Sequence, residues 1–367
     1  MHYTPCATIS LPTLVSNYHL LSSRLRQFSG KGHLWCVVKS NAYGHGFAPC
    51  VSALYHAGAR YFAVGTLAEG ITLRSLCPLA NILILGVVAM EDTPALLSHN
   101  LTPTIPDYHY AKALSDTLAA PLPVHIKVDC GMGRLGLCHG ETHSALDQIL
   151  SIFRLPNLEI DGLYAHLPDA DNPKSSETPH QIRLFSSLAK QIRDIHPLPH
   201  VHICASAGLL RYGVEAGQDA RVGLALYGHS PSVSLSIPAL CPVMTLRAPL
   251  LQIKGIAKGD RVGYGGTWTA PCDTRIGILP LGYGNGFLRG CEGGFVRVYG
   301  HASSIVGRIS MNYTTIWLKD IPASAGDLAT IFDSKGKQIK QLAEQAHTIP
   351  YELLSALRDI DYHYLRT

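Results

Sequence analysis

The stretch Leu34-Trp35-Cys36-Val37-Val38-Lys39-Ser40-Asn41-Ala42-Tyr43-Gly44-His45-Gly46 decides how the chain is organised. Its apolar run, followed by a turn that contains Gly and Asn, predicts a strand buried on both faces, as in parallel sheets covered by helices. Lys39 closes this strand. Lysines are rarely buried without a partner, so Lys39 either extends its ammonium group to the surface or serves as an amine. Desolvation at such a place lowers the pKa of the amine and favours covalent addition to an aldehyde or ketone.

A strand-turn-helix pattern recurs from this region to about residue 228. Alternation of strands and helices predicts a parallel sheet with right-handed crossovers, and eight such units predict an α/β fold with a closed (β/α)8 barrel of the TIM type. An open, doubly wound sheet is the competing architecture. The eight predicted strands are Leu34–Val38, Tyr61–Val64, Ile82–Leu85, Leu101–Ile105, Val124–Val128, Ile160–Ala165, Val201–Ala205 and a run near Ala220–Leu226.

The pattern changes after Pro231, where short β-branched runs alternate with glycine turns. These runs predict a mostly antiparallel β domain. Ser and Pro accumulate over 230–239, which places the domain boundary between residues 1–235 and 236–367. The early run Tyr3–Ile9 is expected to pair with this second sheet. The predicted strands are Val243–Ile256, Thr274–Leu281, Phe295–Val298, Ser304–Ile309 and Thr314–Leu318, with a helix near Gln338–Ala346 and a further segment at Tyr351–Arg358.

Composition indicates a globular enzyme. The 367 residues are 47% hydrophobic and 15% charged, with a formal net charge of +4, so neither disorder nor nucleic-acid binding is expected. The first residues lack the basic start and apolar core of a secretory signal, and no apolar stretch is long enough to span a membrane. A cytoplasmic location is therefore expected.

The cysteines and histidines give no sign of a disulfide framework or a metal centre. The ten cysteines contain no CxxC pair, and several lie in apolar runs, so we expect buried, reduced thiols. Among the nineteen histidines, the pair His200 and His202 lacks the further ligands that a zinc site needs. No protein-bound metal is expected.

Polar residues at the carboxyl ends of the predicted strands are the candidates for an active site, because a barrel of this type presents its site there. Lys127 ends the fifth strand and Arg134 follows in a glycine-rich loop, where its guanidinium suits a carboxylate or a phenolate. His166 ends the sixth strand and Asp171 follows it. Read alone, Arg134 could also be a surface arginine, and His166 could also be a core histidine.

The seventh and eighth strands predict a phosphate site. Ser206 follows the seventh strand, and Arg221-Val222-Gly223-Leu224 belongs to the eighth. A hydroxyl and free amides at these two positions fit the loops in which barrels of this type bind phosphate groups. In the second domain, glycine flanks Tyr264 and Tyr283. Either tyrosine is a credible base only if a neighbouring cation lowers its pKa.

The stretch from Val37 to Gly46 resembles the pyridoxal-phosphate attachment sequence of alanine racemases, and the resemblance covers nearly the whole chain. It implies that Lys39 carries the cofactor covalently and acts as the base on the D-substrate face. It also implies that Arg221 faces the pyridine nitrogen of the cofactor, with His166 beside it. An arginine at this position keeps the nitrogen unprotonated and so disfavours side reactions of the cofactor. The positions implied to hold the phosphate are Tyr43, Ser206, Gly223, Leu224 and Tyr351.

The resemblance further implies a homodimer with shared active sites. Tyr264 matches the base on the L-substrate face, which the other subunit contributes in this family. Arg134 matches the arginine that contacts the cofactor's phenolic oxygen and the substrate carboxylate. Lys127 matches a lysine that is carbamylated in many members of the family. Other matched positions, in the substrate pocket or its access channel, are Met311, Asp171 and Tyr283.

The chain departs from the family pattern at two positions. Asn312 stands where most alanine racemases carry an aspartate, and Val222 stands where a proline usually follows the arginine. The first change removes a charge from the pocket rim and would admit a larger or more polar amino acid.

These features predict a pyridoxal-phosphate-dependent racemase that exchanges L- and D-alanine through two opposed bases and supplies D-alanine for peptidoglycan. The nearest alternative is a serine or broad-specificity racemase on the same scaffold. A pyridoxal-phosphate-dependent amino-acid decarboxylase and a non-catalytic carrier of the cofactor are more distant alternatives.

Overall fold

The computed structural model describes residues 3–140, 142–231, 235 and 239–366. Its first part is a ring of parallel strands in the order β10-β2-β3-β4-β5-β6-β8-β9. Between β9 and β10, the amides of Asp219 and Arg221 donate hydrogen bonds to the carbonyls of Val201 and Cys204, at 2.9 and 3.0 Å. The ring is nearly closed, which confirms the predicted barrel and excludes the doubly wound sheet. Its strands are β2 (Leu34–Val37), β3 (Tyr61–Val64), β4 (Asn81–Ile84), β5 (Thr102–Ile105), β6 (Leu122–Asp129), β8 (Leu158–Tyr164), β9 (His200–His202) and β10 (Ala220–Val222).

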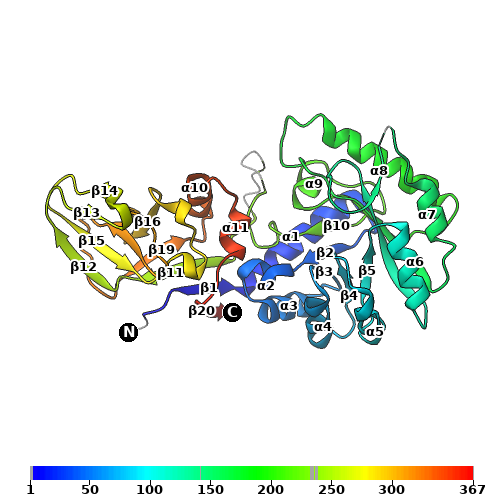
Figure 1. The fold of residues 1–367 in the computed structure, drawn as a ribbon, viewed down its shortest axis with the longest axis horizontal. Helices are drawn as coiled ribbons and strands as arrows, with labels where there is room; N and C mark the ends of the chain where they lie inside the picture. The colour runs from blue at the N-terminus through cyan, green and yellow to red at the C-terminus, as the bar shows by residue number, and fades with distance from the viewer. Residues whose placement is uncertain (1–2, 141, 232–234, 236–238, 367) are drawn as a thin grey trace.

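Helices surround this ring (Figure 1). Local signals start several of them: the Ser10 hydroxyl accepts a hydrogen bond from the amide of Thr13, and Thr66 and Glu69 form a capping box. Because the helices cover the outer faces of the strands, the carboxyl ends remain free to build a site. The helices are α1 (Leu11–Ser29), α2 (Lys39–Gly44), α3 (Phe47–His56), α4 (Leu67–Leu76), α5 (Thr93–Ser98), α6 (Tyr108–Thr117), α7 (Leu146–Ile152), α8 (Glu177–Arg193) and α9 (Ser206–Arg211).

The observed barrel strands differ from the predicted ones mainly at their ends. The seventh strand stops at His202 rather than at Ala205, and the eighth stops at Val222. The eighth is short because the chain turns at once: the amide of Leu226 donates to the carbonyl of Gly223 at 2.8 Å. A further short strand, β7 (Leu137–Cys138), pairs with β6 and was not predicted.

The second part of the chain is built from β-sheets, as predicted. A six-stranded sheet has the order β17-β16-β19-β11-β1-β20 and includes β1 (Cys6–Ser10) from the start of the chain. β1 pairs antiparallel with β11 and parallel with β20, which confirms the expectation for Tyr3–Ile9. The other strands of this sheet are β11 (Met244–Pro249), β16 (Phe295–Val298), β17 (His301–Ser304), β19 (Leu328–Phe332) and β20 (Asp361–Leu365).

Two smaller sheets and two helices complete this part. A three-stranded sheet has the order β12-β15-β18, and β13 pairs with β14. The helix predicted near Gln338–Ala346 is present as α10. The elements are β12 (Gln252–Ile256), β13 (Arg261–Val262), β14 (Trp268–Thr269), β15 (Thr274–Leu279), β18 (Thr314–Trp317), α10 (Lys337–Gln345) and α11 (Pro350–Ser355).

Two strand predictions in this part were wrong. Val243–Ile256 is two strands, because the chain leaves the large sheet after Pro249 and joins the small one as β12. Ser304–Ile309 is mostly not a strand. Gly307 adopts a φ of 68°, and a Cβ there would lie 2.6 Å from the carbonyl oxygen of Val262, so this close approach bends the chain. β19 and β20 were not predicted.

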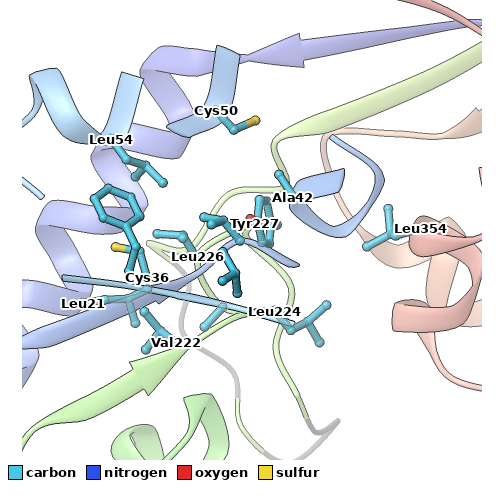
Figure 2. Close-up of a cluster of buried hydrophobic side chains, with 14 of the residues drawn as sticks. Leu21, Cys36, Ala42, Cys50, Leu54, Val222, Leu224, Leu226, Tyr227 and Leu354 are labelled. Carbon is cyan, nitrogen blue, oxygen red and sulfur yellow. The ribbon is translucent and has the colours of Figure 1, made fainter. Parts of the chain in front are cut away.

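The two parts meet beside α2. A Cβ on Gly44 would lie 2.0 Å from the carbonyl oxygen of Leu354 in α11, and the Tyr362 hydroxyl donates to the Gly44 carbonyl at 3.0 Å. Figure 2 shows Leu354 and Ala42 in a buried apolar cluster with side chains from the barrel. The second part therefore packs directly on the turn that follows Lys39. The predicted boundary after residue 235 falls in a segment that lies largely outside the described residues.

All ten cysteines are free thiols. Six are buried, in line with the expectation, whereas Cys138, Cys241 and Cys272 are exposed.

Candidate active site

A cavity of about 800 Å³ opens at the carboxyl ends of the barrel strands. Its walls come from loops after the strands and from α11 of the second part, so it depends on both parts of the chain. The predicted site residues that line it are Lys39, Tyr43, Lys127, Arg134, His166, Asp171, Ser206, Arg221, Gly223, Leu224 and Tyr351.

The turn that carries Lys39 has an unusual backbone. The residues from Ser40 to Tyr43 all adopt φ values between 52° and 55°, which makes α2 a left-handed turn. For residues with a Cβ this conformation costs roughly 1–2 kcal/mol each. None of these residues is glycine, so the surrounding structure has to impose the conformation.

Several contacts hold this turn in place. The amide of Ser40 donates to Oε1 of Glu69 at 2.7 Å, and the amide of Phe47 donates to the Asn41 side chain at 2.8 Å. The buried ring of His45 lies with Nδ1 2.9 Å from the carbonyl oxygen of Tyr43. Together with Leu354, these contacts fix where Lys39 leaves the strand.

The surroundings of Lys39 favour a neutral amine. Burial lowers its pKa, the guanidinium of Arg134 lowers the pKa further, and the carboxylate of Glu69 opposes both effects. A less basic lysine in a cavity is a better nucleophile and base at neutral pH than an exposed one.

Four other residues of the cavity, Tyr43, Ser206, Gly223 and Tyr351, form a cradle suited to an anion. The Ser206 hydroxyl accepts hydrogen bonds from the amides of Gly223 and Ala225, at 3.2 and 3.4 Å. A Cβ on Gly223 would lie 2.2 Å from the Tyr43 hydroxyl, so only glycine lets this hydroxyl reach the cradle. Burial raises the pKa of Tyr43 and raises that of Tyr351 to about 12, so both phenols stay protonated and can donate.

Arg221 places a cation in the cavity wall and, among the described residues, pairs with carbonyls and imidazoles instead of forming a salt bridge with a carboxylate. Its guanidinium donates to the carbonyls of Ala165 and His202 and approaches the Nδ1 atoms of His202, at 2.7 Å, and of His166, at 3.2 Å. Burial lowers the pKa of Arg221 only to about 10, so it stays charged. Burial and then the charge of Arg221 lower the pKa of His166 to about 3, which keeps that imidazole neutral.

Lys127 is the second buried amine of the cavity. Its ammonium group donates to the carbonyl of Val128 at 2.7 Å and lies 5.2 Å from the centre of the Tyr164 ring. Burial and the charge of Arg221 lower its pKa to about 7. The loop that follows wraps around Asp129, whose carboxylate accepts four backbone hydrogen bonds, including one from the amide of Arg134 at 2.8 Å.

The remaining predicted residues lie outside this cavity. Tyr264, Tyr283, Met311 and Asn312 belong to the second part and are exposed, with 70% of the Tyr264 surface and 55% of the Met311 surface accessible. Their loops adjoin one another: the amide of Tyr283 donates to the carbonyl of Ser310 at 3.1 Å, and Gly263 packs against Gly307.

Sequence reasoning missed two residues that shape the site. Glu69 anchors the left-handed turn. The Thr66-x-x-Glu69 pattern of a capping box could have drawn attention to this residue in the sequence. His202 contacts Arg221 directly. From the sequence, His202 was examined only as a possible metal ligand together with His200. Over the described residues, no group of three or more His, Cys, Asp or Glu side chains could hold a metal ion. In the same part of the chain, no helix is both long and apolar enough to cross a membrane.

The fold and site define a barrel enzyme whose cavity contains a lysine of lowered pKa, two phenols and a guanidinium, followed by a second β domain. The family model for the alanine racemase N-terminal domain matches residues 9–231, and the model for the C-terminal domain matches residues 243–363. The chain belongs to the alanine racemase family.

Individual relatives agree with this assignment along their whole length. The chain is 32% identical to an alanine racemase of Streptococcus uberis, covering 100% of this chain and 99% of the relative. A crystal structure of biosynthetic alanine racemase from Pseudomonas aeruginosa superimposes with a TM-score of 0.89 at 30% identity, covering 100% of both chains. An alanine racemase from Bartonella henselae, solved with covalently bound pyridoxal phosphate, matches with a TM-score of 0.88 at 26% identity, covering 99% of both chains.

Proposed function

We propose that this protein interconverts L- and D-alanine, with pyridoxal phosphate bound to Lys39. The observation that carries the proposal is the position of Lys39. Its amine, whose pKa is lowered, lies directly after β2, in the same cavity as the anion cradle and the Arg221 guanidinium. Membership of the alanine racemase family supports the same activity.

The residues of the cavity fit this cofactor. A phosphate group suits the cradle, because the Tyr43 and Tyr351 phenols can donate to it and the missing Cβ of Gly223 lets the Tyr43 hydroxyl reach it. Arg221 can donate toward a ring nitrogen but cannot protonate it, since a guanidinium keeps its own protons. When bound, pyridoxal phosphate withdraws electrons from the amino acid and makes its Cα proton acidic.

Proton exchange on opposite faces requires two bases, since one base would have to cross the plane of the substrate. Lys39 is the base on the D-substrate face. Tyr264 of the partner subunit is the base on the L-substrate face. Within one chain Tyr264 is exposed and lies outside the cavity, which supports an active homodimer that shares its two sites.

Arg134 and Lys127 orient the substrate. Arg134 reaches the cavity from a loop fixed by Asp129 and presents a planar donor pair suited to the carboxylate of the amino acid. With a pKa of about 7, Lys127 has a neutral amine available to take up carbon dioxide. Carbamylation would give it a negative charge that holds Arg134 in place.

The rim of the pocket determines which amino acids enter. Asp171 lines the open side of the cavity, and Met311, Tyr283 and Asn312 reach it from the partner subunit. The uncharged amide of Asn312 favours a second candidate function, a serine or broad-specificity racemase, because it can hydrogen-bond a substrate hydroxyl without imposing a charge. No observation favours a decarboxylase. A cytoplasmic enzyme that supplies D-alanine for peptidoglycan is the role that we propose.

The direct test is an absorbance spectrum of the purified protein, followed by borohydride reduction, peptide mapping and an assay of D-alanine formed from L-alanine. We expect pyridoxal phosphate fixed to Lys39, and alanine that becomes racemic. Cofactor on Lys39 with serine turnover that exceeds alanine turnover would favour the second candidate. Protein that binds no cofactor under saturating conditions would overturn the proposal.

A further inference from the structure

The barrel interior beneath Arg221 is polar, although such interiors are usually filled by branched apolar side chains. His125 from β6 and His202 from β9 are fully buried there, and His200 is largely buried. Trp35 packs among them, with ring centres 5.3 to 5.6 Å from all three imidazoles. Burying polar groups costs free energy unless they are hydrogen-bonded. A buried layer of imidazoles in place of apolar side chains therefore indicates a function for these histidines.

These imidazoles form a line that leads away from the active site. Nη1 of Arg221 lies 2.7 Å from Nδ1 of His202. Nε2 of His202 lies 3.0 Å from Nδ1 of His125. Nε2 of His125 in turn faces Oδ2 of Asp161 at 3.6 Å. The line thus runs from a cation in the cavity wall to a carboxylate at the far end of the barrel.

In the orientation that Arg221 has in this structure, the guanidinium indicates where the protons lie along the line. Arginine has donors only, so Nδ1 of His202 must accept and Nε2 of His202 must carry the proton. That proton points at Nδ1 of His125, which places the proton of His125 on Nε2, toward Asp161. Arg221 thus donates to His202, and His202 donates to His125, whereas the N–H of His125 only faces the Asp161 carboxylate, because at 3.6 Å the pair is too far apart for a hydrogen bond.

The backbone places Asp161 where the line ends. The pairing of β6 with β8 shifts register between Val124 and His125: Val124 pairs with Ile160, and His125 with Gly162. Asp161 is therefore the extra residue of a β-bulge, a feature that commonly redirects one side chain. Gly162 makes room for the imidazole, since a Cβ there would lie 2.6 Å from the His125 ring.

The carboxylate of Asp219, which lies nearby, already has other hydrogen-bond partners. It accepts hydrogen bonds from the amide of His33 at 2.7 Å and from the Trp35 indole at 2.9 Å, and its Oδ2 lies 2.6 Å from Nδ1 of His200. His125 consequently depends on Asp161. The contact with His125 lowers the pKa of Asp161, which keeps this carboxylate ionised.

We propose that His125 and Asp161 are positioning residues that hold His202 in the tautomer whose Nδ1 accepts from Arg221, and so fix the guanidinium that faces the cofactor. This inference rests on the proposed function for the role of Arg221. Without the line, His202 can carry its proton on Nδ1, where an N–H would oppose the N–H of Arg221. The guanidinium would then turn away from its present orientation.

The test reads the tautomer directly in cofactor-free protein. The variants are Asp161→Ala, which removes the carboxylate that faces His125, and His125→Leu, which breaks the line in the middle. Asp161→Asn restores an acceptor without charge and keeps the shape of the site. Tyr61→Phe is the matched control, because Tyr61 packs against His200 at the same end of the barrel but is not part of the line. Side-chain ¹⁵N chemical shifts, assigned with a His202→Gln variant, report which nitrogen of His202 carries the proton.

We expect only Nε2 of His202 to be protonated in the unmodified protein and in Tyr61→Phe. In Asp161→Ala and His125→Leu we expect a mixture of tautomers and about fivefold to tenfold weaker binding of pyridoxal phosphate, the equivalent of one lost hydrogen bond. Asp161→Asn should recover most of both properties. An unchanged His202 tautomer in Asp161→Ala would overturn the inference. Because this readout needs no cofactor, it remains decisive even if the proposed racemase activity fails.

Discussion

The backbone amide of Ser40 donates a 2.7 Å hydrogen bond to Oε1 of Glu69, and this contact ties the left-handed turn after Lys39 to the start of α4. The other carboxylate oxygen accepts from the amides of Gly65 and Thr66, at 2.8 and 3.3 Å. One side chain thus takes part in a helix cap and restrains the strained turn next to Lys39. The position of Lys39 therefore depends on a residue that does not line the cavity.

Replacing this side chain should therefore cost more than an ordinary helix cap. We expect Glu69→Ala to lower the free energy of unfolding by about 2 kcal/mol, because several backbone donors lose their acceptor. It should also reduce the fraction of protein that retains cofactor. Urea denaturation and cofactor absorbance measure the two effects. Glu177→Ala is the control, since it also removes a carboxylate from the first turn of a helix. Equal losses in both variants would contradict the role of Glu69.

Lys127 should make stability depend on pH. Its pKa is about 7 in the folded protein and near the ordinary value of 10.5 in the unfolded chain. Between these pH values the unfolded chain binds a proton that the folded protein does not, so stability should rise with pH across this window. In bicarbonate-free buffer, Lys127→Met should flatten that slope in urea titrations. An unaltered slope would mean that Lys127 keeps its proton on folding.

Asn312 should widen the range of substrates. If it lies at the pocket rim of the partner subunit, Asn312→Asp should reduce serine turnover relative to alanine turnover, because a charge there penalises a second polar group. We expect a change of about tenfold in the ratio of kcat/KM values, in the range of a single polar contact. The same ratio in both proteins would remove Asn312 from the specificity determinants.

Tyr264 should be needed for one face of the substrate only. In Tyr264→Phe, racemisation should fall by about 10²- to 10⁴-fold, the usual contribution of a general base. D-Alanine should still exchange its α hydrogen with solvent deuterium through Lys39, whereas L-alanine should not; proton NMR follows both. Tyr299→Phe, at another exposed tyrosine of the second part, is the control. Exchange of both enantiomers at similar rates would contradict the assignment of two bases.

Much of the fold could be predicted because the apolar runs of the barrel repeat with regular spacing. Lys39 and Ser206 follow two of these runs and Arg221 lies in the last, and all three line one cavity because parallel strands all end at the same side of a barrel. The short strand β7 and the strands β19 and β20 carry too few residues, or too mixed a pattern, to stand out from loops.

The parts that could not be predicted depend on contacts between distant segments. No glycine marks the left-handed turn from Ser40 to Tyr43, since Glu69 and Leu354 impose it from elsewhere in the chain. Likewise, nothing in the sequence around Asp161 reveals the bulge that turns this carboxylate toward His125. Alternation of apolar and polar residues predicts which face of the sheet a side chain occupies only while the strand is regular, and a bulge interrupts that regularity.

The central claim is that Lys39 of one subunit works with Tyr264 of the partner subunit. The most direct test mixes two inactive variants, Lys39→Ala and Tyr264→Phe, and lets their subunits exchange at random. Half of the dimers then contain one copy of each variant, and each of these has one intact site out of two, so we expect about a quarter of the normal racemase activity to return. A mixture that forms mixed dimers but stays inactive would show that both residues must belong to the same chain, and would contradict the shared site.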